Sequence, residues 1–425
     1  MHEITQLPNG LKIITRHMAE TESVTVNIFV GAGGRYEDMN TEYGAAHFLE
    51  HLLFKGTHKR PSAKIISEEI DSVGGYMNAY TAEDHTSYHI KLPKNYFGLA
   101  LNILADIVTD PLFEQKEIDR ERNVILEEMK VYKDDPARYV YDLVGDLLWP
   151  NDTLRTNVIG NEHIISTMSR ETIVNYFNQL YTMDNMVLSV AGNVSHKKVV
   201  DMATELLSNV QSKVQRIWHP VQGDISPSRV SVLNSDTNQT HMLMVGRAPQ
   251  IDASDEAAMK VLSTILGSGM SSRLFLNVRE NKGLAYTVYM SFTSFVDSGK
   301  YEIYAGVNND KVYDAIRAIH DELLKIQQLP VSDKELNKAK EQVRGRYIMG
   351  LEGNASVADM QGTEMILSGR AWTLQEILAK VDKVNSDDIL ACAKKYLNKD
   401  LVRLAMIGPY GEDRIHQFEK IMEEK

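Results

Sequence analysis

The chain has 425 residues, of which 43% are hydrophobic and 24% charged, enough to bury substantial cores in about two to four domains. Its formal net charge of −12 argues against non-specific nucleic-acid binding. The single cysteine, Cys392, excludes an intrachain disulfide and suits a reducing compartment.

No apolar run reaches the length of a transmembrane helix, so no membrane partner is expected. The first residues, MHEITQLPNG, lack the basic and then apolar pattern of a signal peptide. Together with the cysteine content, these observations favour a soluble protein of the cytoplasm.

The first chemically informative element is the stretch AAHFLEHLLFKGT at residues 45–57, which is predicted to be a helix. Residues three and four apart share a helical face, so His47, Glu50 and His51 should converge while apolar residues cover the remaining surface. One interpretation is a buried histidine pair with an ion-paired glutamate. The other is the order-reversed form of the HExxH zinc helix, in which two imidazoles bind the metal and the carboxylate accepts a proton from water. The spacing favours zinc.

A catalytic zinc site usually has three protein ligands, so a third ligand must come from elsewhere. The richest source is FEQKEIDRERNVILEEMKVYKDD at residues 113–135, which contains no Gly or Pro and is predicted to be one long helix. Glu121 and Glu128 are seven residues apart and therefore lie on one face. The apolar positions at the helical period are Ile118, Val124, Ile125 and Met129. A solvated face with charge pairs is the alternative interpretation.

The second half of the chain repeats patterns of the first. EIDRERNVI at 117–125 resembles ELNKAKEQV at 335–343, and residues 168–181 resemble residues 385–397. The stretch 211–230 contains two prolines and little periodicity, which is typical of a linker. These echoes favour a duplication, with chance similarity between two helix-rich halves as the alternative.

A duplication predicts an N-terminal domain at 1–210 and a homologous C-terminal domain at 231–425. The second-half counterpart of the histidine helix is EAAMKVLSTIL at 256–266. There the polar groups are all replaced: Met259, Leu262, Ser263 and Arg346 stand where the first half has His47, Glu50, His51 and Glu128. If the four residues of the first half act together at one metal ion, a domain that no longer binds the ion is expected to have replaced all four.

Five stretches of the chain carry a resemblance to one known family. They are LPNGLKII (7–14), GAAHFLEHLLFKGT (44–57), GGYMNAYTAEDHTSY (74–88), ERNVILEEM (121–129) and NVRENKGLAYTVY (277–289). Together they resemble the zinc peptidases with the inverted HxxEH motif, which include pitrilysin, insulin-degrading enzyme and the mitochondrial processing peptidases, and most closely the short bacterial members. The resemblance implies two homologous α+β domains, each a mainly antiparallel sheet packed with helices, that form one half-shell of a clamshell.

The resemblance implies Zn²⁺ as the cofactor, with His47, His51 and Glu128 as its ligands. The separation of 128 − 51 = 77 residues places Glu128 at the family's third ligand, whereas Glu127 is off by one.

Two further glutamates receive catalytic roles by the same resemblance. Glu50 is the expected general base for the attacking water, and Glu121 is expected to support the site. The implied activity is that of a zinc metalloendopeptidase, which hydrolyses unfolded peptides or oligopeptides in a closed chamber.

Substrate contacts are implied at four positions. The stretch GGYMNAYT at 74–81 is predicted to be a strand that follows a glycine turn, and its Asn78 and Ala79 match substrate-contacting positions on a strand that offers its edge to an extended peptide. Arg279 and Tyr286 match a pair that reaches the scissile carbonyl in larger relatives. Without the resemblance, these would be an ordinary sheet strand, a surface arginine and a core tyrosine.

One departure from the family bears on specificity. Arg138 stands where the mitochondrial catalytic subunit has an acidic residue linked to arginine recognition, although Asp142 keeps the second such position. Broad oligopeptide hydrolysis is therefore expected in preference to presequence processing.

The resemblance also implies a homodimer, because its members use four copies of the α+β unit and this chain carries two. Arg279 and Tyr286 of one chain would then serve the zinc site of the other. Two alternatives are a noncatalytic scaffold of the same fold and a zinc-dependent peptide-binding module with negligible turnover. The intact HxxEH motif argues against the first, and Glu50 argues against the second.

Overall fold

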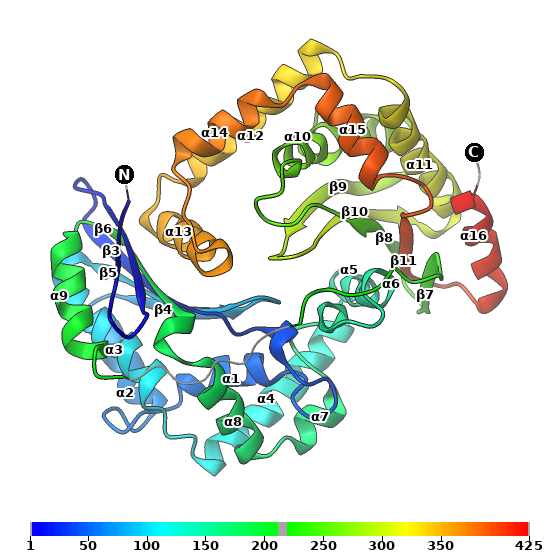
Figure 1. The fold of residues 1–425 in the computed structure, drawn as a ribbon. Helices are drawn as coiled ribbons and strands as arrows, with labels where there is room; N and C mark the ends of the chain where they lie inside the picture. Colours follow the sequence, from blue (N-terminus) through cyan, green and yellow to red (C-terminus); the bar gives the residue numbers. More distant parts are fainter. Residues whose placement is uncertain (1, 211–218, 424–425) are drawn as a thin grey trace. The chain divides into compact units, whose positions relative to one another are not determined.

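The computed structural model describes residues 2–210 and 219–423. The chain divides into two compact units, each of which draws on both halves of the sequence (Figure 1). Unit 1 consists of Met1–Lys130, Thr156–His219 and Ile348–Thr373. Unit 2 consists of Val131–Arg155, Pro220–Tyr347 and Leu374–Lys425.

These units do not coincide with the continuous ranges 1–210 and 231–425 expected from the sequence. Residues 131–155 of the first half belong to unit 2, and residues 348–373 of the second half belong to unit 1. Residues 211–218 of the expected linker 211–230 lie outside the described residues.

Unit 1 is built on a six-stranded sheet with the order β1-β2-β6-β3-β5-β4. Its strands are β1 (Glu3–Gln6), β2 (Lys12–His17), β3 (Ser23–Val30), β4 (Tyr76–Thr81), β5 (Thr86–Pro93) and β6 (Met186–Gly192). Only β2 and β6 pair in parallel, and all other neighbours are antiparallel. The sheet therefore ends in β4 on one side and in β1 on the other.

Helices of the first half cover one face of this sheet. They are α1 (Ala45–Leu53), α2 (Ala63–Asp71), α3 (Phe97–Thr109), α4 (Gln115–Lys133), α7 (Glu162–Thr167), α8 (Arg170–Leu180) and α9 (His196–Leu207). Side chains alternate across a strand, so Val26 and Ile28 of β3 enter the core beneath these helices while Phe29 points to the opposite face. β3 is thus buried on both sides.

The opposite face is covered by α13 (Asn354–Ser368), which comes from the second half of the chain (Figure 1). Ile14, Phe29 and Val187 pack there against Met365 and Ala371. The polar groups are also matched, because the Gln361 amide donates to the Ser189 hydroxyl at 3.0 Å and to the Val190 carbonyl at 3.2 Å.

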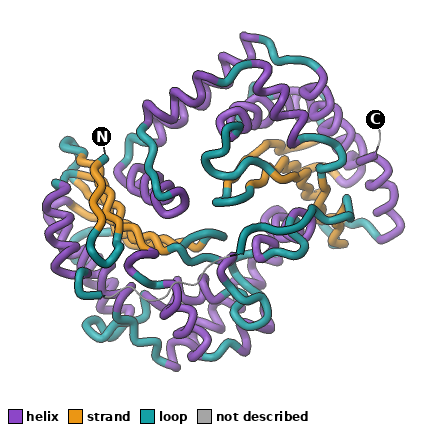
Figure 2. Tube along the Cα trace, viewed as in Figure 1, coloured by secondary structure: helices purple, strands orange, loops and turns teal. Residues whose placement is uncertain are grey.

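Unit 2 contains a five-stranded sheet with the order β7-β11-β8-β10-β9. The strands are β7 (Val230–Asn234), β8 (Gln239–Arg247), β9 (Ala285–Ser294), β10 (Gly299–Asn308) and β11 (Arg403–Gly408). Here β7 and β11 form the one parallel pair, and the chain visits the five positions in the same order as β2 to β6 of unit 1. The strands of both sheets are drawn in orange in Figure 2. The shared topology confirms two homologous α+β domains.

The helices of unit 2 occupy corresponding places in the chain. They are α10 (Glu256–Gly267), α11 (Val312–Gln328), α12 (Asp333–Gly350), α14 (Leu374–Lys383), α15 (Ser386–Tyr396) and α16 (Ile415–Glu423). The exchanged segment of the first half contains α5 (Pro136–Tyr139) and α6 (Gly145–Leu148), and its Leu148 and Trp149 share a core with Leu243 and Ala405. Each exchanged segment follows a long helix, α4 or α12, so the two halves exchange equivalent parts.

The helix expected at 113–135 is α4, Gln115–Lys133. Of the four apolar residues at the helical period, Ile118, Ile125 and Met129 are buried, whereas Val124 is 45% exposed. Val124 directly precedes Ile125, and one step along a helix turns the side chain by about 100°, away from the buried stripe. No helix in the described ranges combines the length and apolar content needed to cross a bilayer.

Candidate metal centre

Helix α1 starts at a fixed point because of two local features. Gly44 precedes it with φ of 101°, a left-handed conformation that a side chain would strain. The buried carboxylate of Glu37 accepts the first free amides of the helix, from Gly44 and Ala46, at 2.8 Å each. These two features fix the residue at which the helix begins and therefore the directions in which its side chains point.

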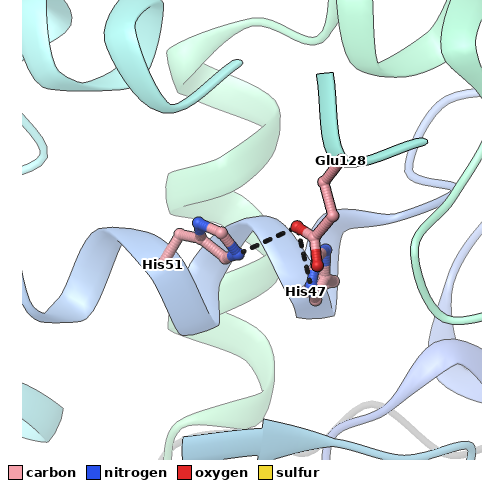
Figure 3. A group of neighbouring side chains, drawn as sticks. All are labelled: His47, His51 and Glu128. Atoms are coloured by element: carbon pink, nitrogen blue, oxygen red, sulfur yellow. Dashed lines mark ion pairs between the residues drawn. The ribbon is translucent and has the colours of Figure 1, made fainter. Parts of the chain in front are cut away.

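The structure brings His47, His51 and Glu128 together (Figure 3). Glu128 comes from α4, and its Oε2 lies 3.9 Å from His47 Nε2 and 3.7 Å from His51 Nε2. All three donor atoms lie within 4.8 Å of one another. Ligands of a tetrahedral zinc ion lie about 3.4 Å apart, so the three donor atoms here, all within 4.8 Å of one another, are only slightly more widely spaced than such a site requires. The donor set fits zinc.

The imidazole of His47 is held neutral, as a metal ligand must be. Burial, with a smaller contribution from neighbouring His51, lowers the pKa of His47 to about 3. Its Nδ1, which carries the proton of the neutral ring when Nε2 binds a metal, is buried without a hydrogen-bond partner among the described residues. Nε2 faces Glu128.

The orientation of His51 is set by Glu121. His51 Nδ1 lies 3.1 Å from Glu121 Oε2, and because a carboxylate only accepts, the imidazole donates and leaves Nε2 free to bind a metal. Lys55 Nζ lies 2.8 Å from the other oxygen of Glu121 and balances its buried charge. Glu121 therefore contacts the ring nitrogen of His51 that does not face Glu128.

Glu50 stands on the same helix as the histidines but bonds elsewhere. The Thr81 hydroxyl at the end of β4 donates to its carboxylate at 2.5 Å. Burial raises the pKa of Glu50, while the bond from Thr81 and the nearby His51 lower it. The Glu50 carboxylate is therefore not one of the three groups that converge at the candidate metal site, which are His47, His51 and Glu128.

Sequence reasoning missed Thr81 and Lys55. Strand alternation gave a signal for Thr81, because it lies two residues after Ala79 and shares its face. Lys55 is four residues after His51 and could have been placed beside it as a continuation of the helix.

The four residues expected to contact substrate lie in two places. Asn78 and Ala79 are on β4, the edge strand of unit 1. Arg279 and Tyr286 belong to unit 2, where the guanidinium carbon lies 5.4 Å from the centre of the tyrosine ring. Tyr286 is 74% exposed and is therefore not the core aromatic suggested by the residues alone.

Comparison with known proteins identifies the family. Residues 12–162 match the family described as "Insulinase (Peptidase family M16)", and residues 167–343 match "Peptidase M16 inactive domain". The chain belongs to the insulinase family. The insulinase match contains α1 and α4, whereas the inactive-domain match contains α10, which lacks the polar groups of α1.

Relatives of similar length support this assignment to the insulinase family. An uncharacterized zinc protease of Streptomyces coelicolor is 34% identical over 417 residues, covering 95% of this chain and 89% of that protein. An uncharacterized zinc protease of Bacillus subtilis is 32% identical over 404 residues, covering 95% and 97%.

Solved structures share the insulinase fold. A protease from Helicobacter pylori matches with a TM-score of 0.89 and 22% identity, covering 96% of this chain and 99% of that one. A peptidase M16 inactive domain from Pseudomonas fluorescens matches with a TM-score of 0.88 and 19% identity, covering 97% and 98%.

Proposed function

We propose that this chain is a zinc metalloendopeptidase that hydrolyses peptide bonds of unfolded peptides or oligopeptides. The observation that carries the proposal is the convergence of His47, His51 and Glu128, with an unligated Glu50 on the same helix. The relatives named as zinc proteases support the same metal and reaction class.

The chain's own residues supply the remaining chemistry. Zn²⁺ held by the two imidazoles and Glu128 would act as a Lewis acid for the scissile carbonyl and lower the pKa of water. Glu50 accepts a proton from the attacking water and passes it to the leaving amine, so that water is divided between the two products. Thr81 holds the Glu50 carboxylate in place, and Glu121 orients His51.

Substrate binding is assigned to the edge of β4, where Asn78 and Ala79 would meet an extended peptide through main-chain hydrogen bonds. Such main-chain pairing depends little on the sequence of the peptide, which is consistent with hydrolysis of a broad range of oligopeptides. Arg279 and Tyr286 would contact the scissile carbonyl from a second chain in a cytoplasmic homodimer that encloses its substrate.

Two other functions fit the same fold, namely a noncatalytic scaffold and a peptide-binding subunit that retains metal. Zinc content and cleavage of a fluorogenic peptide, measured on wild-type protein and on Glu50→Gln, separate the three. We expect about one zinc per chain in both proteins, with hydrolysis at least about a hundredfold slower in Glu50→Gln. Wild-type protein that binds zinc without cleaving any peptide would be a binding subunit, and protein without zinc affinity would be a scaffold.

A further inference from the structure

The outer edge of β4 presents a defined set of backbone groups. The hairpin to β5 closes with a hydrogen bond from the Ala82 amide to the His85 carbonyl at 2.8 Å, and the two strands then pair in regular register. In an antiparallel pair, successive residues alternate between bonding to the neighbouring strand and pointing away from it. Counting back from Ala82, the residues whose backbone N–H and C=O groups point away from β5 are Thr81, Ala79 and Met77.

One of these outward groups is already occupied. The Ala79 amide donates to Oδ1 of its neighbour Asn78 at 2.9 Å. Nδ2 of the same side chain donates to the Tyr76 hydroxyl at 2.8 Å, so both ends of the Asn78 amide are engaged. Tyr76 is 57% exposed, and the centre of its ring lies 6.1 Å from that of the His89 ring on β5.

We propose that Asn78 caps the free edge of β4 in the substrate-free protein, and that Tyr76 is a positioning residue that sets how readily this cap opens. The proposal rests on the proposed function, because the competing ligand is an extended peptide that adds to β4. A carbonyl of that peptide must replace Asn78 Oδ1 at the Ala79 amide. The displaced side chain is then free to bind the peptide in turn.

The cap would both limit unwanted pairing of the edge strand and still allow a substrate peptide to bind there. Unpaired edge amides invite pairing with any other chain, and a side chain that satisfies one of them reduces that tendency. An extended peptide offers several carbonyls at once and can displace a single amide oxygen. The Tyr76 hydroxyl stabilises only the closed arrangement, so its removal should favour the open one.

Tyr76→Phe tests the proposal, with Tyr96→Phe as the matched control. Tyr96 is also an exposed tyrosine of unit 1, but it lies outside β4. One lost hydrogen bond should lower KM for a fluorogenic peptide about two- to tenfold, with kcat unchanged because Glu50 and Thr81 are untouched. The Kd of a labelled unfolded peptide, measured in the Glu50→Gln background, should fall by the same factor. An unchanged or raised Kd would overturn the proposal.

Amide exchange tests the cap without any substrate. The dipeptide Asn-Ala occurs twice, at 78–79 and 354–355, so ¹³C-carbonyl asparagine with ¹⁵N-alanine labels two amides only. Exchange of the Ala79 amide should quicken about two- to tenfold in Tyr76→Phe, while the Ala355 amide stays unchanged as an internal reference. Equal exchange in wild-type and Tyr76→Phe protein would exclude the cap even in an active peptidase. If exchange is faster in Tyr76→Phe but the wild-type protein cleaves no peptide, the cap would be supported and the proposed peptidase function would be contradicted.

Discussion

The Thr81 hydroxyl donates a hydrogen bond to the Glu50 carboxylate over 2.5 Å. This contact joins the last residue of the edge strand β4 to the helix that carries both histidines. The strand assigned to substrate and the proposed general base are therefore fixed to each other directly.

Thr81→Val removes this hydroxyl and keeps the shape of the side chain. A hydrogen bond to a charged group is worth enough that kcat should fall about ten- to a hundredfold. Zinc content should not change, because the Thr81 hydroxyl bonds to Glu50, which is not one of the three proposed metal ligands. Thr81→Ser should restore most of kcat, and a Thr81→Val enzyme with unaltered kcat would contradict the assigned role.

The position of the third ligand is tested by two neighbouring substitutions. Glu128 faces the histidines, whereas the Glu127 side chain is 71% exposed and pairs with Lys130 at 2.7 Å. Glu128→Gln should lose zinc and activity together, while Glu127→Gln keeps both. Zinc analysis after dialysis against a weak chelator measures the difference, and the reverse pattern would move the site by one residue.

Glu121→Gln probes the support behind His51. The amide cannot balance Lys55 as the carboxylate does and holds the imidazole less firmly, so zinc affinity should fall roughly ten- to a hundredfold. Activity should recover when zinc is added in excess, which distinguishes this variant from Glu50→Gln. Permanent loss of activity at saturating zinc would assign Glu121 a direct part in the reaction.

Subunit mixing tests whether two chains share a site. A Glu50→Gln chain and an Arg279→Ala, Tyr286→Phe chain, each inactive alone, should regain activity when their subunits exchange, because each heterodimer contains one complete site. A mixture of Glu50→Gln with Glu128→Gln is the control and should stay inactive, since both defects lie in the same half. Failure to regain activity despite measured exchange would rule out a shared site, and an active monomer would rule out the dimer.

Gly362→Ala should destabilise unit 1. A Cβ at this position would lie 2.0 Å from Cε2 of Phe29, a contact that requires the helix or the ring to shift. Overpacking of this kind costs about 1–3 kcal/mol, measurable as a lower midpoint in urea. Gly350→Ala is the control, because a Cβ there meets nothing within 4 Å. Equal midpoints for the two variants would mean that α13 is not closely packed on the sheet.

Much of the site could be predicted because its residues belong to regular local patterns. The spacing of His47, Glu50 and His51 fixes a common helical face, and the turn at Gly74, with φ of 68°, precedes β4 as expected. The third ligand was harder, since α4 contains several glutamates and its periodicity alone does not separate Glu127 from Glu128. The family spacing pointed to Glu128, which the structure places beside the histidines.

The exchange of segments between the two units could not be predicted from the chain. The apolar periodicity of residues 354–368 is weak, so the sequence of this helix does not indicate which sheet it covers. The information lies in long-range complementarity, such as Gly362 against Phe29 and Gln361 against Ser189. Neither contact has a local signal in the sequence.

The placement of α13 has a consequence for synthesis on the ribosome. The strands of unit 1 are complete at Gly192, but the helix that covers their second face ends at Ser368. At about 5–20 residues per second, Phe29 and its apolar neighbours stay uncovered for roughly ten to forty seconds on the nascent chain. The half of the chain that carries His47, His51 and Glu128 is therefore synthesised first but covered late, and we expect nascent chains halted near residue 210 to bind general chaperones through that face.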